Sequence, residues 1–142
     1  MSKTFHLKVI TPNNIVLDEP VEQVIARTIH GEIGILPDHI PLITPLTAAP
    51  FQYWKNGEQK IAAVLGGMME VSKEGVTIIS DHAALAEEID TVVAEKEKEL
   101  AQAKLAQKKD KVDVQKAELE LTRLLVMLEA AQLAKKLRKT TV

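Results

Sequence analysis

The sequence predicts an α+β protein, in which an N-terminal antiparallel β-sandwich is followed by a C-terminal antiparallel two-helix hairpin. In residues 5–80, short apolar runs are interrupted about every 8–12 residues by Pro, Gly, Asn or Asp, a spacing typical of sandwiches and barrels. No Gly or Pro occurs from 89 to 142, where the strong helix formers Ala, Glu, Lys, Leu and Gln dominate. A chain of 142 residues is enough for one compact domain plus an appendage. We place the sandwich domain at 1–87 and the helical hairpin at 88–142.

The first two strands are predicted from alternation and from turn chemistry. Apolar and polar side chains alternate along residues 5–10, and the apolar run Ile15-Val16-Leu17 follows shortly after. Between them, Thr11-Pro12-Asn13-Asn14 supplies residue types that favour a turn. We therefore expect a first hairpin in this part of the chain.

Two further turns predict a meander over residues 51–80. Asn56-Gly57 separates two apolar runs, and both residue types tolerate the positive φ angles of a tight two-residue hairpin turn. Lys73-Glu74-Gly75 separates the next two runs in a similar way. Such short loops join strands that are neighbours in a sheet, because closing a short loop costs little entropy.

The first helix is predicted to begin at Asp90, whose carboxylate can accept hydrogen bonds from amides of the first turn, and to end near Gln107. The polar stretch Lys108-Lys109-Asp110-Lys111 is the expected break before the second helix. Apolar strips are predicted on both helices: Val93, Ala94, Leu100, Ala101 and Ala103 on the first, and Ala117, Leu121, Leu124, Leu125, Leu128 and Ala131 on the second. A hairpin of this kind is marginal in water, so it can open when another surface competes for its apolar strip.

Composition excludes several classes of protein. The formal net charge is −2, from 18 basic and 20 acidic residues, so no global positive field exists to bind nucleic acid. Cysteine is absent, which removes disulfides, thiolate catalysis and cysteine-ligated zinc, and fits a reducing compartment. No apolar run approaches the roughly 18 residues of a membrane span, so we expect no direct membrane insertion.

Neither a metal site nor a catalytic site is indicated. The four histidines stand at no ligand-like spacing with carboxylates: His6, His30, His39 and His82. No phosphate-binding loop of the Walker type occurs, and Gly66-Gly67 precedes an apolar strand rather than a helix. We therefore predict no metal and no catalytic residue, and we interpret the chain as a non-enzyme.

The segments Gly31–Leu42 and Gly66–Val71 resemble the signature regions of the epsilon subunits of bacterial F-type ATP synthases. The order of a sandwich and a helical hairpin is similar to that family along nearly the whole chain. The resemblance implies a central-stalk rotor subunit, peripheral on the cytoplasmic face of the bacterial plasma membrane. Such a subunit couples ion-driven c-ring rotation to ATP synthesis and inhibits ATP hydrolysis through its C-terminal helices.

The resemblance also implies partners and contact residues. The partners are the gamma subunit, the c-ring and, for the extended hairpin, the catalytic alpha and beta subunits. Glu32 and His39 fall at positions that the family uses near the c-ring. Judged from residue chemistry alone, this Gly- and Pro-containing segment is equally consistent with a structural turn.

A second interpretation is an ATP-sensing regulatory module. Some bacterial members of this family bind ATP through a segment Ile-Asp-x-x-Arg-Ala at the start of the first helix, together with arginines on the second. The similar stretch Ile89–Ala94 keeps Asp90, and Arg123 is kept on the second helix. The remaining positions hold Val93, Ala84 and Met127. No cofactor is therefore expected, and ATP is at most a weak regulatory ligand, since each lost guanidinium contact costs about 1.5–3 kcal/mol.

The alternative roles of these two residues are structural. Asp90 caps the first helix, and Arg123 lies within helical reach of Glu120. We keep both interpretations open at this point.

Five basic residues of the second helix are candidates for inhibitory contacts. The resemblance implies that they meet acidic loops of the catalytic beta subunits when the hairpin extends: Lys116, Arg123, Lys135, Lys136 and Arg138. The helix dipole favours cations near a helix C-terminus, which is a sufficient structural reason for the last three. A third interpretation, an unrelated sandwich with a coiled-coil adaptor tail, needs a longer heptad pattern than the roughly two heptads present.

Overall fold

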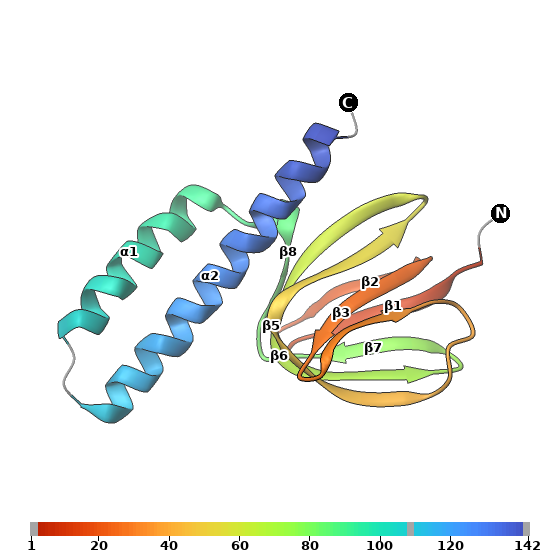
Figure 1. Cartoon of the computed structure of the whole chain (residues 1–142), viewed down its shortest axis with the longest axis horizontal. Coiled ribbons are helices and arrows are strands. Elements are labelled where there is room, and N and C mark those ends of the chain that lie inside the picture. Colours follow the sequence, from red (N-terminus) through yellow and green to blue (C-terminus); the bar gives the residue numbers. More distant parts are fainter. Residues whose placement is uncertain (1–2, 108–109, 141–142) are drawn as a thin grey trace.

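A computed structural model describes residues 3–107 and 110–140 of the chain. Eight strands precede the helices: β1 Phe5–Ile10, β2 Ile15–Val21, β3 Gln23–Thr28, β4 Gly31–Ile35, β5 Leu42–Lys55, β6 Glu58–Ser72, β7 Gly75–Ile79 and β8 Ala83–Leu85. A short 3-10 helix, η1 (Ala86–Glu88), leads into α1 (Thr91–Gln107) and α2 (Lys111–Thr140). The predicted fold class, a sandwich followed by a helical hairpin, is confirmed (Figure 1).

The strands are joined in the order β2-β1-β7-β6-β5-β3-β4, and β8 pairs with β6. The long strands β5 and β6 take part in both layers of the sandwich: the C-terminal half of β6 pairs with β7 and its N-terminal half pairs with β8. All pairings are antiparallel except that between β1 and β7, which is parallel. A parallel pairing is possible here because β1 and β7 are far apart in the sequence and are not joined by a hairpin turn, which would force an antiparallel pairing.

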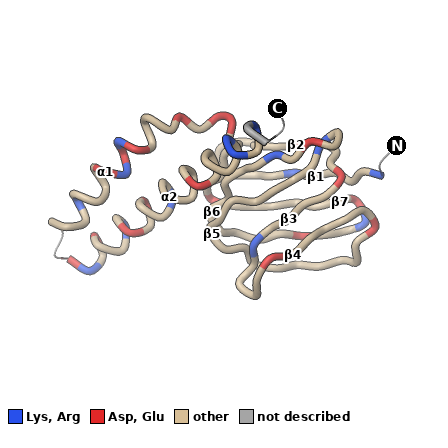
Figure 2. The backbone as a smooth tube through the Cα atoms, turned by 45° about the horizontal axis from the view of Figure 1, so that its top comes forward, with Lys and Arg blue, Asp and Glu red and all other residues tan. Residues whose placement is uncertain are grey.

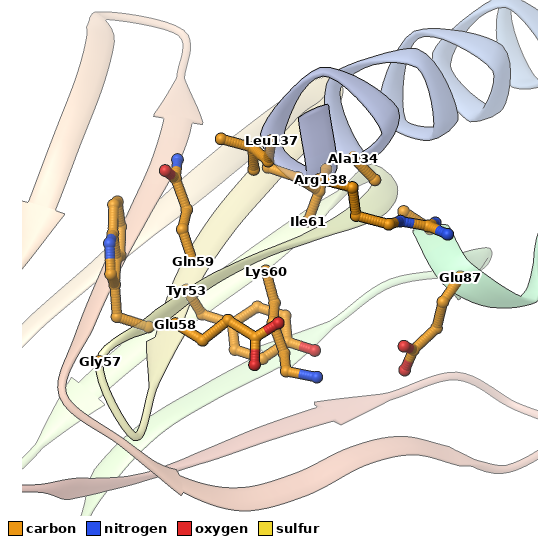
Figure 3. Close-up of a pocket in the computed structure, with 12 residues that line it drawn as sticks. Tyr53, Gly57, Glu58, Gln59, Lys60, Ile61, Glu87, Ala134, Leu137 and Arg138 are labelled. Atoms are coloured by element: carbon orange, nitrogen blue, oxygen red, sulfur yellow. The ribbon is translucent and has the colours of Figure 1, made fainter. Parts of the chain in front are cut away.

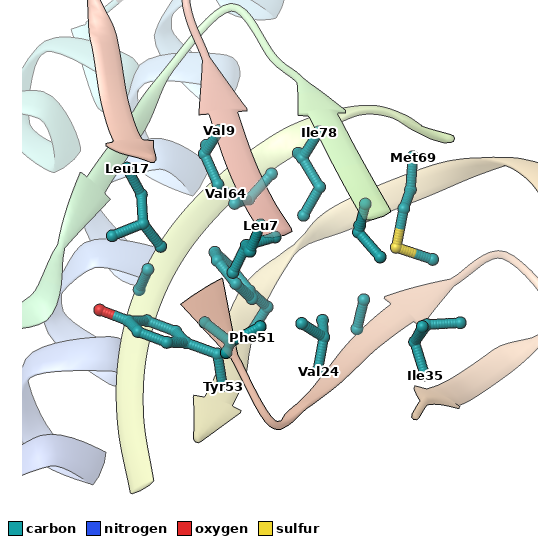
Figure 4. Close-up of a cluster of buried hydrophobic side chains, with 14 of the residues drawn as sticks. Leu7, Val9, Leu17, Val24, Ile35, Phe51, Tyr53, Val64, Met69 and Ile78 are labelled. Atoms are coloured by element: carbon teal, nitrogen blue, oxygen red, sulfur yellow. The ribbon is translucent and has the colours of Figure 1, made fainter. Parts of the chain in front are cut away.

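The core of the sandwich lies between the two layers (Figure 4). Alternate residues of the strands supply it, as the period of two in a strand requires. Its central side chains include Leu7, Val9, Val24, Phe51 and Ile78. Burial of this apolar surface is the main source of stability for a chain that has no disulfide.

The three predicted hairpin turns are confirmed, and the last of them, at Lys73-Glu74-Gly75, differs from the prediction in one respect. β1 and β2 pair in antiparallel register, and Asn56 and Gly57 join β5 to β6 with φ angles of 53° and 77°. In the next turn Gly75 is the first residue of β7, and a Cβ atom there would lie 2.2 Å from the carbonyl oxygen of His6. A side chain at position 75 would thus collide with β1. Gly75 is therefore needed for the parallel pairing of β7 with β1 as well as for the turn.

Gly67 gives a direct test of backbone packing in the sandwich. Its φ angle is +110°, and an added Cβ atom would lie 2.1 Å from the carbonyl oxygen of Ile79. We expect Gly67→Ala to lower the free energy of unfolding by about 3 kcal/mol or more, because it adds both backbone strain and a clash with rigid backbone. Urea denaturation measures the effect. Gly34→Ala is the matched control, since no atom lies within 4 Å of its Cβ position and its φ is not positive; an equal loss in the control would contradict the explanation.

The helix boundaries follow from caps. The Asp90 carboxylate accepts hydrogen bonds from the backbone amides of Val92 (3.0 Å) and Val93 (3.2 Å), so the predicted N-cap of α1 is confirmed. Asp110, which we assigned to the break, caps α2 in the same way through the amide of Val112 (3.1 Å). Lys108 and Lys109, the other part of the predicted break, lie outside the described residues.

The apolar strip predicted on α1 is partly wrong. Ala94 and Ala101 are buried, but Val93 and Ala103 are exposed, and Leu100 keeps 62% of its surface exposed. The helix turns its face of Ala94, Lys98, Ala101 and Leu105 toward α2, at spacings of four and three residues. Val93 and Leu100 each lie one residue before a buried alanine, so they point about 100° away from the contact.

The strip predicted on α2 is correct except at Leu125. Its other members are buried or half-buried: Ala117, Leu121, Leu124, Leu128 and Ala131. Leu125 is exposed because it lies one residue beyond Leu124 and points away from α1.

A second buried face of α2, absent from our predictions, packs against the sandwich. Its residues Val126 and Ala130 form a cluster with Ile61, Ala63 and Ala86. Strand β6 is therefore buried on both sides here, since Ala62 and Val64 face the main core. Three of the five fully buried residues in this contact are alanine, and larger apolar side chains pack half-buried around them: Leu65, Ile89, Met127, Leu133 and Leu137. The C-terminal end of α1 and the N-terminal end of α2 lie away from the sandwich (Figure 1).

Candidate functional site

A row of apolar side chains crosses five strands on the outer side of one layer. The register joins Ile15 to Ile10, Ile10 to Ile79, Ile79 to Met68, and Met68 to Pro45. Directly paired residues place their side chains on the same face of a sheet. All but the half-buried Ile10 are exposed, and Ile79 keeps 56% of its surface accessible. We call these five residues the apolar row.

The apolar row continues along β5 to a further exposed side chain, Ile43, two residues from Pro45 on the same face. Contiguous exposed apolar surface of this kind marks interaction sites on soluble proteins. Our sequence predictions did not include the row. A signal was present in adjacent apolar pairs such as Ile78-Ile79 and Met68-Met69, in which one side chain enters the core and its neighbour must face outward.

The predicted c-ring residues lie at separate places on one segment. Glu32 is exposed on β4, and its Oε1 atom lies 3.8 Å from Nη2 of Arg27 on the neighbouring strand. His39 is half-buried in the following loop, where its Nδ1 atom lies 2.7 Å from the carbonyl oxygen of Ile40. Large apolar side chains stand exposed around them: Ile29, Leu36 and Ile40. The segment thus combines charge with apolar surface, while the role of Glu32 and His39 stays a prediction.

The structure separates the two predicted nucleotide-binding residues. Asp90 is engaged as a helix cap, whereas Arg123 borders a cavity of about 160 Å³ that Ala84 and Met127 also line and Asp90 does not. Arg123 pairs across the hairpin rather than with Glu120, the residue within its helical reach: its Nη2 atom lies 4.0 Å from Oε2 of Glu97 on α1. ATP as a weak regulatory ligand stays a prediction.

Removal of the Asp90 cap tests its structural role. We expect Asp90→Ala to destabilise α1 by about 1 kcal/mol, since two backbone amides lose their acceptor. Amide hydrogen exchange should accelerate in the first turn of α1. Asp90→Asn keeps an acceptor oxygen and should exchange at nearly the original rate; a faster rate in both variants would point to the charge instead.

The five candidate inhibitory cations do not form one cluster. Lys116 and Arg138 are 22 positions apart on one helix, about 33 Å at 1.5 Å per residue. Lys116, Lys135, Lys136 and Arg138 are exposed, and Arg123 is half-buried. Lys136 and Arg138 already interact within the chain. An acidic partner surface would therefore have to run along α2 rather than meet it at one point.

A larger cavity, of about 480 Å³, lies where the end of α2 meets the sandwich (Figure 3). The tip of the β5–β6 hairpin, η1 and the last turns of α2 form its walls. Tyr53 is among the lining residues; burial, and then the carboxylates of Glu19, Glu87 and Glu88, raise the pKa of its hydroxyl to about 12. We call this the seam cavity, because it forms only when the helical hairpin and the sandwich are in contact.

Charge on the described surface is mixed. Both helices carry residues of both signs, isolated charges lie on the strands, and the last turns of α2 carry Lys135, Lys136 and Arg138 without an acidic residue among them (Figure 2). In the described ranges, no three His, Asp or Glu side chains are placed to hold a metal ion. Neither described helix combines the length and the apolarity needed to cross a bilayer.

Comparison with known proteins agrees with this architecture. Residues 4–86 match the family described as ATP synthase, Delta/Epsilon chain, beta-sandwich domain. The ATP synthase epsilon chain of Caldanaerobacter subterraneus is 48% identical over 132 residues, which are 92% of this chain and 96% of that one. The epsilon chain of Halalkalibacterium halodurans is 40% identical over 129 residues, covering 90% and 97%.

Solved structures extend the agreement to three dimensions. A chain of the Euglena gracilis mitochondrial ATP synthase, solved as an OSCP/F1/c-ring assembly, superposes with a TM-score of 0.73 at 29% identity and covers 91% of this chain and 81% of its own length. A chain of the Tetrahymena thermophila mitochondrial ATP synthase central stalk and c-ring shares the fold, with a TM-score of 0.56 at 13% identity, covering 92% and 98%. The chain belongs to the ATP synthase epsilon chain family, and it is a non-catalytic subunit of that complex.

Proposed function

We propose that the chain is a central-stalk rotor subunit of a bacterial F-type ATP synthase, on the cytoplasmic face of the plasma membrane. In this role it couples ion-driven rotation of the c-ring to ATP synthesis and restrains ATP hydrolysis through its C-terminal helices. The observation that carries the proposal is the apolar row, because a subunit that transmits torque needs a permanent contact with its neighbour. Such contacts are apolar at their centre.

The gamma subunit is the partner that we assign to the apolar row. The row crosses five strands, a length of about 19 Å at 4.8 Å per strand. The next row on this face joins Lys8, Thr77, Glu70 and Ile43, so charged side chains border the apolar row and Ile43 extends it. An apolar centre with a polar rim suits a long-lived protein contact.

The c-ring is the partner that we assign to the segment of Glu32 and His39. Two of its apolar side chains, Leu36 and Ile40, stand exposed beside His39. The Euglena and Tetrahymena assemblies named above include a c-ring, which supports the assignment. A loop that combines apolar and charged contacts can rest on the polar loops of a membrane ring without entering the bilayer.

The hairpin is proposed to occupy two positions. On the side of α2 that faces the sandwich, an apolar residue recurs every seven positions: Val112, Leu119, Val126 and Leu133. Val126 is buried, whereas Leu119, beyond the edge of the sandwich, keeps 72% of its surface exposed. The same face can therefore lie along another surface when the hairpin detaches, and bury more of its apolar side chains there. In that position the cations of α2 would meet acidic loops of the catalytic subunits.

A truncation tests the two roles separately. The purified catalytic complex is reconstituted with the full chain or with the chain ended after Glu88, and ATP hydrolysis and retention of the chain are measured. We expect the truncated chain to stay bound through the apolar row and hydrolysis to rise several-fold. Unchanged hydrolysis would remove inhibition as a role, and failure of both forms to bind would overturn the assignment to the stalk.

A further inference from the structure

The methionines in the described part of the chain have different environments. Met69 has no exposed surface and belongs to the core of the sandwich, whereas Met68 is exposed in the apolar row. Met127 of α2 is half-buried where the helical hairpin meets the sandwich, and it packs against the cluster that contains Val126 and Ala130. Of the described methionines, Met127 is therefore the one that lies between the two parts of the chain.

A cavity gives small molecules access to the side chain of Met127. This is the cavity of about 160 Å³ that Arg123 borders, and its walls also include Asn13 and Asn14 of the β1–β2 turn. It is large enough for molecules of the size of water or hydrogen peroxide. Because Met127 lines the cavity and is only half-buried, a small oxidant can reach it while the hairpin stays packed.

A hydrogen-bond donor is already directed at the sulfur. The Nη1 atom of Arg123, one turn earlier on α2, lies 3.8 Å from Sδ of Met127, and the Nη2 atom lies 4.0 Å from Oε2 of Glu97. A thioether sulfur is a weak acceptor, whereas the oxygen of a sulfoxide is strongly polar. The guanidinium has enough N–H groups to bond such an oxygen and still face Glu97. The oxidised side chain would therefore find a partner on this side.

We propose that Met127 is a site of reversible oxidation, at which a peroxide converts the thioether to a sulfoxide. A lone pair of Sδ attacks one oxygen of hydrogen peroxide, so that an S–O bond forms while the O–O bond breaks. The departing hydroxide takes the proton of the transferred oxygen and leaves as water. Sulfur loses two electrons and the peroxide gains them. Sulfoxide reductases reverse this modification of methionine.

Oxidation of Met127 is expected to weaken the contact between α2 and the sandwich. The thioether packs against an apolar cluster, and the sulfoxide is polar. Arg123 can bond the new oxygen whether or not the hairpin is packed, because both residues belong to α2, so this bond does not hold the hairpin in place. The detached population should rise about tenfold, since roughly half of the burial free energy of a methionine side chain is lost. Only a resulting change in ATP hydrolysis depends on the proposed function.

Peroxide treatment of the full chain, followed by peptide mass spectrometry, tests the site. Met68 is an exposed reference and Met69 a buried one in the same sample, and fragment ions distinguish these neighbours. We expect Met127 to be oxidised at a rate within about tenfold of Met68 and at least about tenfold faster than Met69, because oxidation follows exposure. If Met127 remains reduced after Met68 has been fully oxidised, the inference is overturned.

Amide hydrogen exchange tests the consequence of oxidation. After peroxide treatment, exchange in α2 around Val126 and Ala130 should become about tenfold faster. Met127→Leu is the matched control, because it keeps an apolar side chain of similar volume, has no sulfur and retains Met68. Peroxide should leave its exchange unchanged; an equal response in both chains, or no response in either, would overturn the inference. These measurements use the chain without the catalytic complex, so the inference and the proposed function fail separately.

Discussion

Exchange of Ile79 for aspartate should weaken binding to the gamma subunit by about 100-fold or more. Ile79 lies in the middle of the apolar row, between Ile10 and Met68, and more than half of its surface is exposed in the free chain. A carboxylate there would be buried against an apolar partner without a counter-ion, and central interface positions of this kind are worth about 2–4 kcal/mol or more. Binding of the variant to purified gamma subunit, followed by calorimetry, measures the effect.

Val92→Asp is the control for this exchange. Val92 has a similar exposed fraction but lies in the first turn of α1, outside the apolar row. An added carboxylate near a helix N-terminus is tolerated or slightly favourable. The variant should bind gamma as the original chain does. If Ile79→Asp binds equally well, the apolar row is not the contact with gamma, whatever its exposure.

The second large effect is expected at Ala130, which has no exposed surface and packs α2 onto Ile61, Ala63 and Ala86. Aspartate at this position would be an unpaired charge inside an apolar cluster, which costs several kcal/mol. Because Ala130 lies at the centre of the contact with the hairpin and outside the core of the sandwich, we expect the hairpin to detach while the sandwich stays folded. The detached population should rise by about 100-fold or more, and amide exchange in α2 should accelerate accordingly.

Enzyme assays give the second readout of this variant. If detachment delivers the hairpin to its inhibitory position, complexes with Ala130→Asp should hydrolyse ATP more slowly than the original complex, while the truncated chain gives faster hydrolysis. Ala103→Asp, the same exchange at an exposed position of α1, should change neither exchange rates nor hydrolysis. If amide exchange in α2 becomes faster but ATP hydrolysis does not become slower, detachment of the hairpin is not sufficient for inhibition.

The parts of the fold that the sequence predicted depend on local chemistry. Asn56-Gly57 suits a two-residue turn wherever it occurs between strands, and Asp90 caps a helix through its own side chain. The direction in which a helix faces is not local. Leu125 and Val126 are adjacent and both apolar. Val126 is buried and Leu125 is exposed only because the sandwich lies on the side of α2 that carries Val126.

The candidate surfaces were harder to predict for the same reason. The residues of the apolar row are far apart in the sequence, since Ile10, Pro45 and Ile79 come from three different parts of the sandwich. Only the strand register places them side by side. The seam cavity needs three elements to meet before it exists. The sequence did contain one signal. In pairs such as Val9-Ile10 two adjacent residues are both apolar, which interrupts the alternation of apolar and polar residues and places an apolar side chain on each face of the strand.

The parallel pairing of β1 with β7 has a consequence for how the chain reaches its fold. His6 and Gly75, which lie opposite each other in this pair, come from the two ends of the sandwich sequence. During synthesis β1 has only β2 beside it until nearly the whole sandwich has left the ribosome. Contacts between such distant segments form slowly, because a long loop must close before they gain any free energy. Formation of the β1–β7 pair is therefore the expected rate-limiting step of folding.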